Sequence, residues 1–192
     1  MRRSFVPLVL SAALALSACG SSSSSKGAGA GVTDSTGVEV FSSPSYEKAG
    51  PTPSKSAKMV CQKEARDDIA VTLGVKETSV TKPVWVKAQH LYSCTYVYPK
   101  GRITLTVKEL VDAGTTTAYF ETLQTKYGTT QQLIGLGQGA WILKNNDVLV
   151  RKDYKVLFVD VHGIPPTFGL AMTRSDVATN IAVAIMGCWK GA

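Results

Sequence analysis

The sequence predicts an α+β domain with a twisted, mainly antiparallel sheet of about six strands and helices packed on one face. Two observations carry this prediction. Apolar residues recur at every fourth position from Cys61 to Leu73, which is the spacing of one face of a helix. Apolar and polar residues alternate over residues 103–108, which is typical of a strand with one buried face.

The first half of the domain is expected to hold one helix and three strands. The helix ends near Gly74, since glycine favours the residue that follows a helix. A short strand is expected at residues 84–86 and a longer one at 91–98. The Pro-Lys-Gly sequence at 99–101 predicts a hairpin between this longer strand and the run 103–108.

The second half repeats this order and closes with a helix. The expected elements are a helix at 115–127 ended by Gly128, strands at 139–144, 148–152 and 155–161, and a helix from Ser175, as N-cap, to Cys188. Asn-Asn-Asp at 145–147 predicts a tight turn between two of these strands. The glycine-rich stretch 135–139 is followed by a strand rather than a helix, so we interpret it as a turn and not as a phosphate-binding loop.

The N-terminus has the features of an export signal. Arg2 and Arg3 precede an apolar run at residues 5–16, and small residues then lead into Cys19. The ending Leu-Ser-Ala-Cys resembles the bacterial lipobox, which implies that residues 1–18 are removed and that Cys19 is acylated, for example with palmitate. An ordinary secretory signal cut after Ala18 is the alternative. A membrane-spanning helix is excluded by length, since it needs about 20 apolar residues.

Residues 19–57 are expected to form a flexible tether, and residues 58–192 one globular domain. The tether is rich in Ser, Gly and Pro, and its few large apolar residues follow no helical or strand period. Such a segment buries too little apolar surface to offset the entropy of ordering its backbone. The domain that follows is long enough to bury one hydrophobic core.

The charge of the chain argues against a nucleic-acid partner. Removal of residues 1–18 leaves 19 basic and 14 acidic residues, a net charge of +5. The basic residues are spread along the domain with acids between them, whereas nucleic-acid binding needs a concentrated basic patch. We therefore expect no nucleic-acid partner. Contact with the membrane through the lipid anchor is expected instead.

Three cysteines remain in the domain if Cys19 is acylated. An exported protein meets an environment that permits disulfides, so one disulfide and one thiol are expected. Cys61 lies on the apolar face of the first helix and Cys94 in a strand expected beneath it, which favours the pair Cys61–Cys94. Cys188 also lies on an inward face, so Cys61–Cys188 remains an alternative.

A row of tyrosines is the candidate ligand face. Tyr92, Tyr96 and Tyr98 alternate along one strand and therefore share a face, and Phe158 is the aromatic residue added to this face from another strand. Tyrosines combine an apolar ring with a polar tip, which suits a ligand groove as well as a half-covered sheet. Because Cys94 lies on the same face, packing in the core is the favoured interpretation.

The sequence does not favour an enzyme, a metal site or a cofactor. Asp160 and His162 alternate on one strand, but no Gly-x-Ser-x-Gly motif places Ser93 or Ser175 beside them as a nucleophile. A zinc site needs about four ligands, and the chain has two histidines. We therefore expect no catalytic residue, no metal and no cofactor.

The succession of motifs resembles a known group of proteins. A lipobox and Ser-rich tether precede a Cys at the opening of a helix, then Ser-Cys-Thr-Tyr at 93–96 and Ile-Gly-Leu-Gly-Gln-Gly-Ala at 134–140. This resembles uncharacterised cell-envelope lipoproteins of actinobacteria and, more distantly, the extracellular sensor domain of mycobacterial receptor Ser/Thr kinases. The resemblance implies an α+β sandwich with one sheet on the outer side of the cell membrane, and it implies no catalytic residue.

Two functions follow as expectations. The first is a non-enzymatic binding or sensing module, anchored outside the cell, that holds a small molecule or lipid beside the tyrosine face. The second is a structural or interaction lipoprotein that docks to another envelope protein or to the cell wall.

Overall fold

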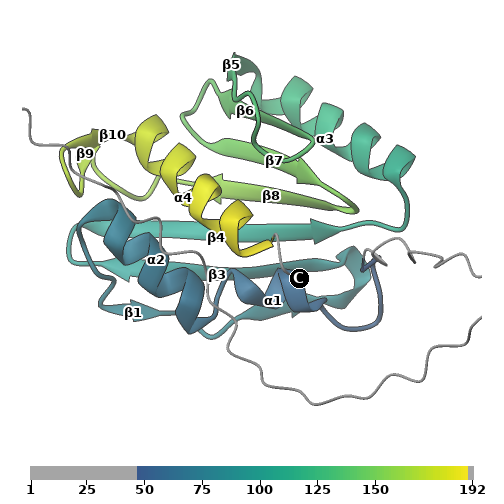
Figure 1. Ribbon diagram of the computed structural model, residues 1–192, viewed down its shortest axis with the longest axis horizontal. Coiled ribbons are helices and arrows are strands. Elements are labelled where there is room, and N and C mark those ends of the chain that lie inside the picture. The colour runs from purple at the N-terminus through teal and green to yellow at the C-terminus, as the bar shows by residue number, and fades with distance from the viewer. Residues whose placement is uncertain (1–46, 190–192) are drawn as a thin grey trace, which may run out of the picture.

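A computed structural model describes residues 47–189, in which eight strands form one sheet (Figure 1). The strands of the sheet are β1 (Ser79–Val80), β2 (Val84–Val86), β3 (Leu91–Tyr98), β4 (Gly101–Glu109), β5 (Thr129–Gln132), β6 (Gly139–Leu143), β7 (Val148–Lys152) and β8 (Lys155–Asp160). The other elements are the helices α1 (Lys55–Met59), α2 (Lys63–Leu73), α3 (Ala113–Tyr127) and α4 (Arg174–Cys188), a 3₁₀ turn (Lys87–Gln89), and the hairpin strands β9 (Thr167–Phe168) and β10 (Met172–Thr173).

The sheet has the order β1-β3-β4-β8-β7-β6-β5, with β2 also beside β3, and the paired strands are antiparallel. The predicted α+β class and mainly antiparallel sheet are confirmed. The six expected strands correspond to β2, β3, β4, β6, β7 and β8. Strands β1 and β5 were not predicted, because they are short and lack apolar–polar alternation.

The main core lies between one face of the sheet and the helices α1, α2 and α4 (Figure 1). Ile69 and Leu73 of α2 and Ile181 of α4 are buried there against alternate residues of β3 and β4. The N-cap of α4 is Thr173 and not Ser175, because the Thr173 side chain accepts from the Asp176 amide and the Asp176 side chain accepts in return from the Thr173 amide.

The expectation that all helices pack on one face is wrong for α3, which covers the opposite face of β6, β7 and β8. Phe120 of α3 is buried there with Leu149 and Val156 in a second core. The uninterrupted apolar run 148–150 explains the difference. A strand buried on one face alternates, whereas a strand covered on both faces is apolar at every position.

The folded part of the chain begins earlier than the predicted boundary at residue 58. Ala57 is fully buried, the Ser54 amide donates to Glu109 Oε1 (3.1 Å), and Lys155 Nζ donates to the Glu47 carbonyl (2.9 Å). Residues 47–57 are therefore part of the domain rather than of the tether. Much of this segment is held by polar contacts, which leave no apolar periodicity in the sequence, and the boundary was therefore predicted too late. The predicted signal, Cys19 and residues 20–46 lie outside the described residues.

The disulfide joins Cys61 and Cys94, whose Cα atoms are 6.0 Å apart, and this confirms the favoured pairing. It links the turn between α1 and α2 to the centre of β3. Cys188, at the end of α4, lies outside the disulfide, and its Sγ donates to Asp68 Oδ2 (3.4 Å). Within residues 47–189, no helix combines the length and the apolar character needed to cross a membrane.

Candidate functional site

The tyrosine row is part of the main core and does not form an open ligand face. Tyr92, Tyr96 and Tyr98 are 8%, 1% and 4% exposed. Tyr96 Oη donates to the Val60 carbonyl (2.6 Å), and burial raises the pKa of Tyr96 and of Tyr98. The favoured packing interpretation accounts for these three residues, because α1 and α2 cover this face.

Phe158 lies on the other face of the sheet and is separated from the tyrosines. It pairs with Thr106, whereas Tyr92 pairs with Val107, and adjacent residues of a strand point to opposite faces. The expectation of one shared aromatic face is therefore wrong. This expectation placed residues of two strands on one face, but the relative register of those strands is defined only in the folded sheet.

Phe158 instead lines a groove between α3 and the sheet. Because α3 covers β6 to β8, the part of this face formed by β3 and β4 is only half-buried. The groove has a volume of about 180 Å³. Its walls are mostly apolar or aromatic and are formed by Leu91, Thr106, Lys108, Tyr119, Leu123, Tyr127, Val156 and Phe158.

The α3 wall is a helical stripe. Tyr119, Leu123 and Tyr127 follow one another at four-residue spacing, and the Tyr127 ring lies 5.4 Å from the Phe158 ring. Burial raises the pKa of Tyr119, so its hydroxyl stays neutral at physiological pH. The four-residue spacing from Tyr119 through Leu123 to Tyr127 is the sequence signal that could have identified this wall.

Lys108 is the cationic side chain of the groove. Its Nζ lies 5.6 Å from the centre of the Tyr119 ring and donates to the Gln89 carbonyl. Among the described residues, no carboxylate oxygen lies within 4.0 Å of this ammonium. Burial lowers the pKa of Lys108, because removal from water disfavours the charged form. Lys108 was not predicted as a site residue, because in the sequence it only continues the alternation of a strand.

The apolar surface continues from the groove to the edge of the sheet. Val86 pairs with Leu91, Leu91 with Lys108, and Lys108 with Val156. These four side chains therefore form one row on the face of the sheet that α3 partly covers, which we call the α3 face. Val84 lies on the same face, opposite Ser93. Val84 and Val86 are 54% and 40% exposed, which leaves apolar side chains open to solvent beside the groove.

The N-terminal segment of the domain runs from β8, where Lys155 Nζ donates to the Glu47 carbonyl (2.9 Å), to this edge. The Trp85 indole N–H donates to the Pro51 carbonyl (3.2 Å), and His90 Nδ1 lies 3.0 Å from the Gly50 carbonyl. His90 directly precedes Leu91 of the groove. A wider hollow of about 580 Å³ lies along residues 47–55 with Lys58 and Gln62, and its walls carry no aromatic side chain.

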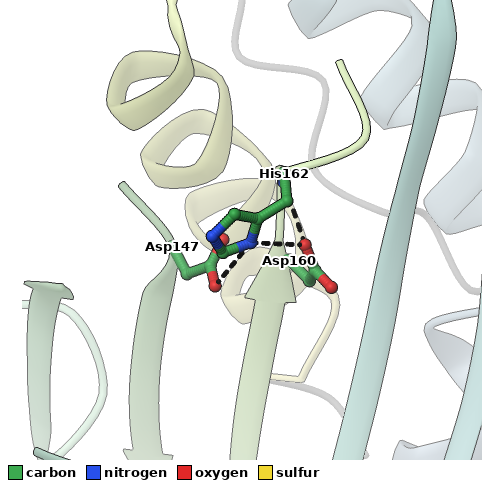
Figure 2. A group of neighbouring side chains, drawn as sticks. All are labelled: Asp147, Asp160 and His162. Carbon is green, nitrogen blue, oxygen red and sulfur yellow. Dashed lines mark hydrogen bonds and ion pairs between the residues drawn. The ribbon is translucent and has the colours of Figure 1, made fainter. Parts of the chain in front are cut away.

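A second group of functional side chains lies at the far end of β8. Figure 2 shows Asp147, Asp160 and His162, whose Nδ1 faces both carboxylates. His162 Nδ1 is 3.3 Å from Asp147 Oδ2 and 3.1 Å from Asp160 Oδ1. Asp160 and His162 were paired from the sequence, whereas Asp147 was not, because it is the turn between β6 and β7 that brings Asp147 to them.

Internal contacts account for this cluster. Asp147 is 1% exposed, and its Oδ1 and Oδ2 accept from the Val161 amide (2.9 Å) and from Asn145 Nδ2 (2.8 Å). Burial raises the pKa of Asp147 to about 6, and the negative charge of Asp160 adds to this effect. One donor atom from each residue of the cluster lies within 4.8 Å of the others, a donor set that suits a divalent cation, yet Asp147 already has partners and we assign no metal.

The cluster lacks the arrangement of a hydrolase triad. Among the described residues, the side-chain partners of the His162 ring are the two carboxylates. Ser175 Oγ instead lies 3.1 Å from Thr173 Oγ1 at the start of α4, and Ser93 lies in β3.

Comparisons with protein-family models, with curated proteins and with solved structures found no match. The family resemblance drawn from the sequence therefore stays a prediction.

Proposed function

We propose that this chain is a membrane-anchored extracytoplasmic lipoprotein that acts as a non-enzymatic binding or sensing module of the cell envelope. The ligand site is the groove between α3 and the sheet. The observation that carries the proposal is the composition of this groove, in which aromatic and aliphatic walls surround one ammonium. Ligand sites in proteins commonly combine such apolar walls with a few polar groups.

The anchor and the outer location rest on the lipobox-like sequence that ends at Cys19 and on the disulfide. Disulfides persist outside the reducing cytoplasm, so the Cys61–Cys94 bridge supports the export of the chain. We propose no catalytic step because His162 does not contact a nucleophile among the described residues. Its side-chain partners there are the carboxylates of Asp147 and Asp160.

A second candidate function is docking to another envelope protein. Strand β2 lies at an edge of the sheet and exposes Val84 and Val86, and an exposed edge strand can pair with a strand of a partner. In this case the apolar surface is covered by protein and the groove holds no separate molecule.

Native mass spectrometry of the full-length chain, extracted from membranes in detergent, tests the proposal. Under denaturing conditions the expected mass is that of the chain from Cys19 with its acyl groups. Under native conditions an additional mass is expected, and it should leave on denaturation. An unacylated chain contradicts the anchor. Equal native and denatured masses contradict the binding function, and a bound protein of defined mass favours the docking function.

A further inference from the structure

We propose that the groove binds the acyl chain of an anionic amphiphile, with Lys108 paired to the anionic head group. This inference rests on the proposed binding function and specifies the class of ligand.

The shape of the surface favours an elongated apolar ligand. The row from Val86 through Leu91 and Lys108 to Val156 crosses four strands. At a spacing of 4.7–4.9 Å between strands, the row is about 14 Å long. The groove at one end has a volume of about 180 Å³. An apolar cavity of about 150 Å³ holds a single benzene ring, so the groove takes one segment of a chain and the exposed valines cover the next.

The charge of the groove favours an anion at one position along this row. Lys108 Nζ has a carbonyl oxygen and an aromatic ring as its partners, and within residues 47–189 no carboxylate lies within 4.0 Å of it. A half-buried ammonium has lost part of its hydration. A carboxylate or phosphate from a ligand would replace that hydration with a charge-assisted hydrogen bond.

The position of the groove favours a ligand that comes from the membrane. The chain that leads back towards Cys19 contacts the sheet through Gly50 and Pro51, next to β2 and Leu91. Glu47, the first described residue, lies at the other end of the row, where its carbonyl accepts from Lys155 beside Val156. The N-terminal segment therefore runs along the same end of the sheet as the whole row from Val86 to Val156, so the predicted tether begins beside the groove.

Photolabelling of the purified full-length lipoprotein tests this inference. The probes are a sixteen-carbon fatty acid with a diazirine in its chain and the corresponding neutral fatty alcohol, and labelled peptides are mapped by mass spectrometry. We expect the fatty acid to label peptides from β2, β3, β4 and α3. Labelling that falls on α2 and α4, or within residues 19–46, would overturn the inference.

Two exposed valines provide a matched pair of variants. Val86→Asp places a charge in the path of the acyl chain and should reduce labelling about fivefold or more, because an apolar chain leaves the carboxylate without water or a partner. Val71→Asp introduces the same charge on α2, at a position that is 81% exposed and belongs to the other face, and labelling should stay within about twofold. Equal labelling of the two variants would contradict the assignment.

Lys108→Gln separates the head group from the chain. Labelling by the fatty acid should fall several-fold in this variant, while labelling by the fatty alcohol stays close to that of the wild type. An equal change for both probes overturns the role of Lys108.

The native mass spectrum distinguishes failure of this inference from failure of the proposed binding function. A bound mass that is not an amphiphile overturns this inference and keeps the binding function. The absence of any bound mass overturns both.

Discussion

At the residue scale, the titration of Asp147 is expected to make the stability of the fold depend on pH. Its carboxyl is buried beside Asp160, and its pKa is raised from an ordinary value of 3.8 to about 6. The folded chain therefore keeps this proton at pH values at which the unfolded chain has lost it. The resulting contribution to the free energy of unfolding is complete below about pH 4 and is lost as the pH rises through about 6.

Asp147→Asn is expected to remove this pH dependence. The amide oxygen can still accept from the Val161 amide, and no charge has to be buried. Relative to the wild type, the variant should gain about 1–3 kcal/mol in the free energy of unfolding between pH 4 and pH 7, since one pKa unit corresponds to about 1.4 kcal/mol. Urea unfolding at several pH values measures this difference. Asp67→Asn on the exposed surface of α2 serves as a control, and an Asp147→Asn curve parallel to that of the wild type would contradict the assignment.

The residue scale also marks a limit of sequence reasoning. Asp160 and His162 could be placed on one face from their alternation alone. Asp147 joins them because a turn with Asn146 in a left-handed conformation (φ 72°) returns the chain beside β8. That juxtaposition depends on the pairing of β7 with β8, which no local pattern specifies. Lys108 was also missed, because it becomes part of a groove only when α3 packs against the sheet.

At the scale of elements, the start of α4 distinguishes two neighbouring hydroxyls. Thr173 forms both hydrogen bonds of the capping box with Asp176, whereas Ser175 lies inside the helix. Thr173→Ala should lower the free energy of unfolding by about 1 kcal/mol, and Ser175→Ala by only a few tenths. Urea unfolding at pH 7 compares the two variants. A larger cost at Ser175 than at Thr173 would favour the N-cap that the sequence pattern indicated, and equal costs would contradict the assignment of Thr173.

The prediction of elements from sequence succeeded where a local signal was strong. Gly74 and Gly128 follow the last residues of α2 and α3, and the alternation over residues 103–108 marks β4. The placement of α3 on the second face was missed, although the run 148–150 carries the signal of a strand that is buried on both sides. Residues 47–57 were missed because hydrogen bonds to Glu109 and Lys155, which come from distant strands, hold them in place.

At the scale of the whole molecule, this N-terminal segment sets the minimal folded unit. A chain that begins at Lys58 loses Ala57, the cap of α1 and the bond from the Trp189 indole to the Ser56 carbonyl. It also leaves Glu109 buried without the Ser54 amide. Its free energy of unfolding should fall by at least about 3 kcal/mol, since each lost buried hydrogen bond costs about 1 kcal/mol or more.

A chain that begins at Glu47 provides the control for this truncation. It keeps all of these contacts and should unfold within about 1 kcal/mol of the full-length protein, because the contacts that carry the stability remain. Urea unfolding of the three chains tests the boundary. Equal free energies of unfolding for the chains that begin at residues 47 and 58 would contradict this boundary and support the predicted tether of residues 19–57.

In the whole molecule, the N-terminal segment 47–57 and the groove lie at the same end of the sheet, and the proposed anchor precedes this segment in the sequence. The helices α1, α2 and α4, together with Phe168 of β9, cover the tyrosine face, while α3 leaves part of the opposite face open beside residues 47–51. The open surface is therefore a consequence of a sheet that is wider than the single helix on its second face.

The central claim is that this open surface holds the ligand. A native mass spectrum of the full-length wild type, Val86→Asp and Val71→Asp, each extracted from membranes in detergent as the proposed lipoprotein, tests it most directly. The account predicts an additional bound mass on the wild type and on Val71→Asp, and its loss from Val86→Asp. Retention of the same bound mass by Val86→Asp, or its loss from Val71→Asp alone, would place the ligand elsewhere and contradict the account.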